Sequence, residues 1–170
     1  NGLVLVDTRT EFGVHCVDID GNLHFQQRLI QLCNYRKMEK ILLDTNFLMA
    51  CFQFRVDIFS EIERICAFNY KIYVLDKTTE ELKNIAEKQK GRHKDAAKIA
   101  VKLLRIKNVA VIETSSKKHT DDVILDYAKN GYIAATQDKD LKRRLLNQGS
   151  TAITLRQKKK LIWVKAKGFA

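Results

Sequence analysis

The chain has 170 residues, of which 45% are hydrophobic and 30% are charged, a balance typical of a folded globular domain. No apolar stretch approaches the roughly 20 residues of a membrane span, and the N-terminus lacks the basic-then-apolar pattern of a signal peptide. The net charge is +11, and the whole excess lies after residue 37. These features exclude a disordered or membrane-embedded chain.

The expected elements fall into two regions. Segments 14–18 and 22–26 flank Asp20-Gly21, a hairpin signal within an N-terminal appendage at 1–37. After it, strands alternate with helices of ten or so residues, which predicts an α/β fold with a parallel sheet covered on both faces. The expected strands are 41–43, 71–75, 109–112, 132–135, 152–155 and 161–164, and the expected helices are 47–54, 56–68, 80–89, 96–106, 121–129 and 139–147. We expect Thr78 or Thr79 to cap the third helix and Thr120 the fifth.

The C-terminal part is strongly basic. After Asp140 the sequence has nine lysines and arginines and no acidic residue. Such a block suits the binding of a polyanion, and the alternative is a solvated basic surface. Binding to an anionic membrane surface is disfavoured, because it would need an amphipathic helix with large apolar anchors. The four cysteines lack CxxC spacing, which favours a reducing, cytoplasmic setting over a zinc or redox site.

Acidic residues occur where parallel strands end. Asp44 follows directly after an expected strand, Asp138 follows another by three residues, and Glu81 and Asp121 each lie in the first turn of a helix that follows a further strand. Because parallel strands bring their carboxyl ends to one edge, we expect these four carboxylates to converge. The alternative for each is helix capping or stabilisation of a helix dipole.

Grouped carboxylates repel one another, and a divalent cation removes that penalty. Oxygen ligands suit Mg²⁺ or Mn²⁺, and such an ion can activate water against a phosphodiester. Asp122 is an alternative metal ligand beside Asp121. We expect Asn46 and Thr136 to orient the carboxylates and Asp140 to be auxiliary.

Four motifs, in this order, resemble the acidic motifs of PIN-domain ribonucleases. They are Ile41-Leu42-Leu43-Asp44-Thr45-Asn46, Glu80-Glu81-Leu82, Asp121-Asp122-Val123-Ile124 and Ala135-Thr136-Gln137-Asp138-Lys139-Asp140-Leu141. The resemblance covers about 38–165. It implies a three-layer α/β/α sandwich and a metal-dependent endoribonuclease, with Asp44, Glu81, Asp121 and Asp138 binding the metal. The spacing from Asp121 to Thr136 is one residue shorter than usual, so the choice between Asp121 and Asp122 stays open.

The stretch 138–145 is similar to the PIN nucleases of the small-subunit processome and their archaeal counterparts, which implies a role in ribosomal RNA maturation. The partners would then be precursor ribosomal RNA and ribosome-assembly proteins, and a homodimer is common among such domains. The alternatives are a VapC-type toxin ribonuclease of a toxin–antitoxin pair and a non-catalytic RNA-binding assembly module. The basic residues expected to contact RNA are Lys88, Lys90, Arg92, Lys94, Lys142, Arg143, Arg144, Arg156, Lys158, Lys159 and Lys160.

Overall fold

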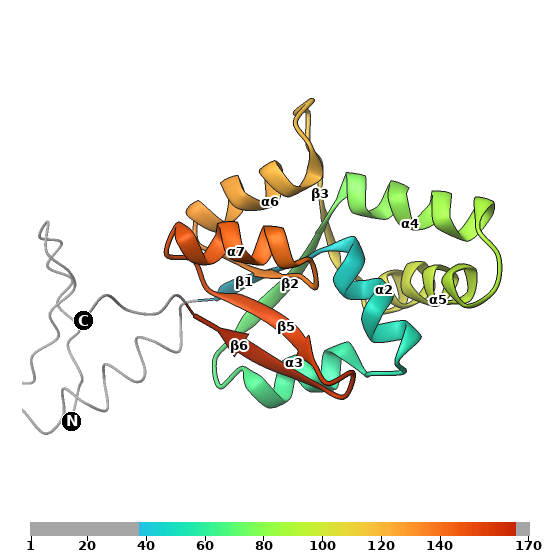
Figure 1. Ribbon diagram of the computed structural model, residues 1–170, viewed down its shortest axis with the longest axis horizontal. Helices are drawn as coiled ribbons and strands as arrows, with labels where there is room; N and C mark the ends of the chain where they lie inside the picture. The colour runs from blue at the N-terminus through green and yellow to red at the C-terminus, as the bar shows by residue number, and fades with distance from the viewer. Residues whose placement is uncertain (1–37, 166–170) are drawn as a thin grey trace, which may run out of the picture. The chain divides into compact units, whose positions relative to one another are not determined.

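A six-stranded sheet forms the centre of the computed structural model, which describes residues 38–165 (Figure 1). The strands are β1 (Glu39–Leu43), β2 (Tyr70–Leu75), β3 (Ala110–Ile112), β4 (Tyr132–Ala135), β5 (Ala152–Arg156) and β6 (Lys160–Val164). Their order is β3-β2-β1-β4-β5-β6, and all neighbours are parallel except the antiparallel pair β5 and β6. The hairpin expected within 1–37 lies outside the described residues.

Helices cover both faces of the sheet. One face packs against α2 (Thr45–Gln53), α3 (Ile58–Ile65), α4 (Asp76–Lys88) and α5 (Arg92–Ile106), and the other against α6 (Thr120–Lys129) and α7 (Lys139–Asn147). The expected α/β/α sandwich is therefore confirmed. Among residues 38–165, no helix is long and apolar enough to cross a membrane.

The central strand β1 is buried on both sides. Ile41 and Leu43 belong to the core beneath α2 and Phe47, while Leu42 belongs to the core beneath α6 and α7. Successive side chains of a strand point to opposite faces, so a run of apolar residues is what a doubly covered strand requires. The apolar run ends at Leu43, so β1 ends there and Asp44 is the first residue beyond the strand.

Five helix starts differ from the sequence predictions by one to four residues, and the largest differences are at α4 and at α5, which begins at Arg92 and not at residue 96. Helix α4 begins at Asp76, directly after β2, so the predicted caps at Thr78 and Thr79 are wrong, and Glu81 lies in the second turn of this helix, not in the first. Thr78 is instead fully buried in the first turn. The acidic residues at 80–81 suggested a later start, but the chain turns into the helix as soon as it leaves the sheet.

The cap of α6 also differs. The N-cap residue is His119, whose imidazole Nδ1 accepts a hydrogen bond from the backbone N–H of Asp121, and Thr120 is the first helical residue. The prediction of Thr120 as the cap is wrong because the helix already includes Thr120, and the side chain of His119 accepts the bond that a hydroxyl usually accepts. The helix ends at Lys129, as predicted, and Gly131 then takes a φ of 84°, which glycine adopts readily.

Candidate functional site

Asp44 lies at the carboxyl end of β1, between β2 and β4, and is 4% exposed. Its backbone N–H donates to the carbonyl of Ala135 over 3.0 Å, which continues the pairing of β1 with β4. The residue occupies the N-cap position of α2, yet its side chain makes no capping hydrogen bond. Its Oδ2 instead accepts a hydrogen bond of 2.9 Å from the hydroxyl of Thr136.

The surroundings of Asp44 oppose its ionisation. Burial is the largest cause that raises the pKa of Asp44, to about 6 from an ordinary value of 3.8, and the negative charges of Asp121 and Glu81 raise it further. Hydrogen bonds from the Thr136 hydroxyl and the Thr45 backbone act in the opposite direction. A desolvated carboxylate is therefore held within electrostatic reach of two others.

Thr136 links two of the predicted carboxylates. It is fully buried, and its hydroxyl donates to Asp44 while it accepts a hydrogen bond of 3.1 Å from the backbone N–H of Asp138. Asp138 in turn caps α7, because its Oδ1 accepts a hydrogen bond of 2.8 Å from the N–H of Leu141. Asp138 therefore caps α7, as its alternative role in the sequence analysis stated, but the cap uses only one of its two carboxylate oxygens.

The structure distinguishes the adjacent pair at the start of α6. Burial raises the pKa of Asp121, and the charges of Asp138 and Asp122 add to this effect, while His119 and Arg144 oppose it. Asp122 forms an ion pair of 2.5 Å with Nη2 of Arg144 on α7. Asp121 is therefore grouped with Asp44 and Asp138, whereas the carboxylate of Asp122 is engaged with α7.

The remaining predicted site residues are more exposed. Glu81 is exposed on α4, although its charge still acts on Asp44, and Asn46 is exposed on the first turn of α2. Asp140 forms an ion pair of 2.9 Å with Arg143 and has a side chain that is 77% exposed. Within the described range, no three His, Cys, Asp or Glu side chains stand close enough together to hold a metal ion. Repulsion between carboxylates favours such a spread arrangement.

The donor set nevertheless suits a hard divalent cation. All candidate ligands are oxygens, and the buried Asp44 carboxylate has the negative charges of Asp121 and Glu81 near it. The hydroxyl of Thr45, the next residue, is buried without a hydrogen-bond partner among the described residues. An unpartnered oxygen beside a desolvated carboxylate is compatible with a site that an ion and its waters would complete.

Asp76 is a residue that the sequence analysis missed. Its Oδ2 accepts a hydrogen bond of 2.9 Å from the N–H of Thr114, and its Oδ1 accepts one of 2.6 Å from the Thr114 hydroxyl. Desolvation alone would raise the pKa of Asp76, but these hydrogen bonds, a further one from the backbone N–H of Lys77 and the Lys77 charge lower it. The available signal was that Asp76 follows β2 directly, as Asp44 follows β1.

Lys77 anchors the same loop. Its Nζ donates to the carbonyl of Ser116 over 2.7 Å and to that of Lys118. This loop leads into α6, which carries Asp121 in its first turn. Asp76 and Lys77 therefore set where the amino end of α6 meets the sheet.

The predicted RNA-contacting residues differ in their surroundings. Arg143 and Arg144 are engaged with acidic neighbours on α7 and α6. Lys158, in the exposed turn between β5 and β6, places its Nζ 4.8 Å from the centre of the Phe54 ring. Two of the other predicted residues, Lys94 in α5 and Lys142 in α7, are half-buried. The rest are exposed: Lys88, Lys90, Arg92, Arg156, Lys159 and Lys160.

Residues 41–158 match the family described as PIN like domain. The chain is a member of the PIN-domain family of nucleases. The solved structure of the PIN domain endonuclease Utp24 has the same fold, with a TM-score of 0.59 and 23% identity over 72% of this chain and 88% of that one. The resemblance found in the acidic motifs is therefore confirmed.

Two curated relatives are similar over most of this PIN domain. Ribonuclease VapC4 of Methanocaldococcus jannaschii is 33% identical over 124 residues, which is 72% of this chain and 94% of the relative. Ribonuclease VapC9 of Archaeoglobus fulgidus is 28% identical over 127 residues, which is 74% of this chain and 89% of the relative. Both are named as ribonucleases.

Proposed function

We propose that this PIN domain is a divalent-metal-dependent endoribonuclease, with Asp44, Glu81, Asp121 and Asp138 holding Mg²⁺ or Mn²⁺. The observation that carries the proposal is the buried carboxylate of Asp44, whose pKa of about 6 reflects desolvation and the charges of Asp121 and Glu81. Such an arrangement costs folding free energy unless a cation offsets it. The two ribonuclease relatives support RNA as the substrate.

The roles of the side chains follow from their contacts. When bound, the cation would activate a water and stabilise the leaving oxygen of the phosphodiester. Thr136 keeps the Asp44 carboxylate in one orientation and ties it to the start of α7 through the N–H of Asp138. Asp76 and Lys77 hold the loop that positions Asp121.

The exposed basic residues would bind the RNA backbone. The turn that contains Lys158 and the connection between α4 and α5 both present lysine or arginine side chains to solvent. Contacts of this kind bind phosphates without regard to sequence. We propose precursor ribosomal RNA as the target, with ribosome-assembly proteins as partners, on the basis of the similarity of stretch 138–145 to the PIN nucleases of the small-subunit processome.

The second candidate is the toxin ribonuclease of a toxin–antitoxin pair. Its support is the 33% identity to ribonuclease VapC4, in an alignment that covers 94% of that protein's length. The chemistry is the same in both candidates, so the carboxylate site does not discriminate between them. The target RNA and the effect of the protein on growth do.

The experiment is cleavage of a labelled, structured ribosomal RNA fragment by the full chain in Mn²⁺, Mg²⁺ or EDTA. We expect cutting that needs the metal and is lost in Asp44→Asn and Asp138→Asn, while Glu63→Gln, at an exposed carboxylate on α3 outside the predicted site, cuts normally. Retained RNA binding in the inactive variants would separate chemistry from affinity. Salt-sensitive binding with no cutting in any metal would refute catalysis and indicate an RNA-binding assembly module.

A growth assay separates the two targets. Induced expression that arrests growth, with no arrest from Asp44→Asn, would favour the toxin. Normal growth together with site-specific cutting of the ribosomal RNA fragment would favour a role in RNA maturation.

A further inference from the structure

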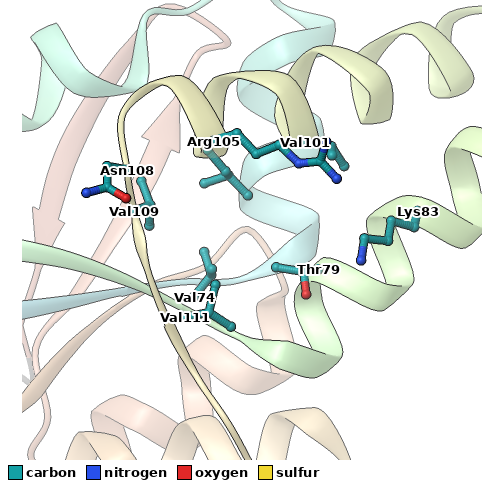
Figure 2. Close-up of a pocket in the computed structure, with 9 residues that line it drawn as sticks. Val74, Thr79, Lys83, Val101, Arg105, Asn108, Val109 and Val111 are labelled. Atoms are coloured by element: carbon teal, nitrogen blue, oxygen red, sulfur yellow. The ribbon is translucent and has the colours of Figure 1, made fainter.

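A cavity of about 340 Å³ opens at the β3 edge of the sheet, on the face covered by α4 and α5 (Figure 2). Val74 and Val111 are paired across β2 and β3 and form its floor together with Val109. Lys83 from α4 and Arg105 from α5 stand at its margin. The cavity is therefore an apolar hollow with a basic rim.

This hollow continues along the helices. A second cavity of about 430 Å³ shares Lys83, Val101 and Arg105 with the first and extends between α4 and α5 toward Ile106. Ile106 is 66% exposed. Lys98 and Lys102 also line it, against a single acidic residue, Glu87. The two cavities make one groove, which we call the α4–α5–β3 groove.

The sheet edge beside the groove is open among the described residues. β3 is at the end of the strand order and is paired with β2 on one side. Val111, in the middle of this three-residue strand, is 52% exposed. An open edge offers backbone N–H and C=O groups to a further strand, and an apolar pocket beside it can receive a side chain of that strand.

We propose that the α4–α5–β3 groove binds an extended, acidic segment of a partner protein, which pairs with the β3 edge and places an apolar side chain in the cavity. The basic rim supplies the charge complementarity, since four of the groove's charged residues are basic and one is acidic. The alternation of a strand presents every second side chain to the groove, so the segment would alternate apolar and acidic residues.

Other occupants fit the groove less well. A second copy of a chain with a net charge of +11 would bring two basic rims together. RNA would contact an apolar surface formed by Val74, Val109 and Val111. Neither cavity is lined by an aromatic ring on which a base could stack.

The groove is distinct from the proposed nuclease site. Thr79 and Lys83 line it from one face of α4, because residues four apart in a helix lie on the same side. Glu81 lies between them in sequence and therefore projects from another side of the helix. The inference does not depend on the proposed function.

The test is selection from a phage-displayed library of random linear 12-residue peptides against the full chain. The full chain with Lys83→Glu and Arg105→Glu serves as the counter-selection target. Both side chains are exposed, so we expect this variant to fold, and circular dichroism checks it. We expect enriched peptides in which acidic and apolar residues alternate, with dissociation constants at least tenfold weaker for the double variant. Val111→Asp, at the open edge, should weaken the same peptides by at least tenfold.

Three outcomes would overturn the proposal. The first is that no peptide is enriched, or that the enriched peptides lack acidic residues or bind the double variant equally well. The second is that labelled RNA, and no peptide, loses affinity in the double variant. The third is that sedimentation shows a dimer that the double variant abolishes while no peptide is selected. RNA cleavage that is unchanged in the double variant would confirm that the groove and the nuclease site are separate.

Discussion

Replacing Asp44 with asparagine should stabilise the metal-free protein at neutral pH. The pKa of Asp44 is raised from 3.8 to about 6, chiefly by burial, so between these values the folded state holds a proton that the unfolded state has released. The free energy of unfolding therefore falls as the pH rises from about 4 to 6. Above pH 6, Asp44 is ionised in both states and causes no further change with pH. Asparagine carries no charge and avoids this loss.

The size of the effect follows from the same pKa. A difference of about two pKa units corresponds to about 3 kcal/mol at roughly 1.36 kcal/mol per unit. Asparagine can still accept the hydrogen bond from Thr136 through its amide oxygen, but its amide NH2 group is a donor that needs an acceptor of its own. We therefore expect Asp44→Asn to gain about 1–3 kcal/mol at pH 8, and less than about 1 kcal/mol at pH 4.

The assay is urea denaturation in EDTA at a series of pH values from 4 to 8. Asp140→Asn is the matched control, since this exposed aspartate should change the unfolding free energy by less than about 0.5 kcal/mol. Adding Mn²⁺ should then stabilise the wild type and leave Asp44→Asn nearly unchanged, because the proposed site would bind the ion only in the folded state and only with the Asp44 carboxylate.

Two results would refute this reasoning. If Asp44→Asn is less stable than the wild type at pH 8 in EDTA, the carboxylate is not the desolvated group that the structure shows. If the gain is equal at pH 4 and pH 8, it does not arise from ionisation.

Three further predictions concern the residues around the site. Thr136→Val should lower cleavage by about 10–100-fold and stability by about 1–3 kcal/mol, and Thr136→Ser should restore both in the same cleavage and urea assays. Asp76→Asn should lower the free energy of unfolding by about 1–3 kcal/mol at pH 7. Because the pKa of Asp76 is lowered in the folded state, the stabilisation by its carboxylate is present above pH 3.8 and is lost as the pH falls through the folded-state pKa. Urea denaturation of both proteins at each pH would show this loss. Changing the three lysines at 158–160 to alanine should reduce the slope of log affinity against log salt by about two for single-stranded RNA, measured by fluorescence anisotropy; an unchanged slope would remove this turn from the RNA surface.

The order of elements and the position of the carboxylates were predictable from the sequence. The apolar runs at β1 and β4 are flanked by polar residues, so they indicate buried strands with Asp44 and Asp138 at their ends. Alternation with helices then implies that the two ends lie at one edge of a parallel sheet, as pairing of β1 with β4 confirms. These inferences depend on patterns within a few residues of each position.

The tertiary structure alone decided which polar groups meet. The hydrogen bond from Thr136 to Asp44 joins residues 92 positions apart, and that from Thr114 to Asp76 joins residues 38 positions apart. Asp121 and Asp122 are neighbours of the same type, and they separate only because Arg144 of α7 lies beside one of them. Local sequence sets propensity and periodicity, whereas hydrogen-bond partners, ion pairs and desolvation depend on the packing of elements distant along the chain.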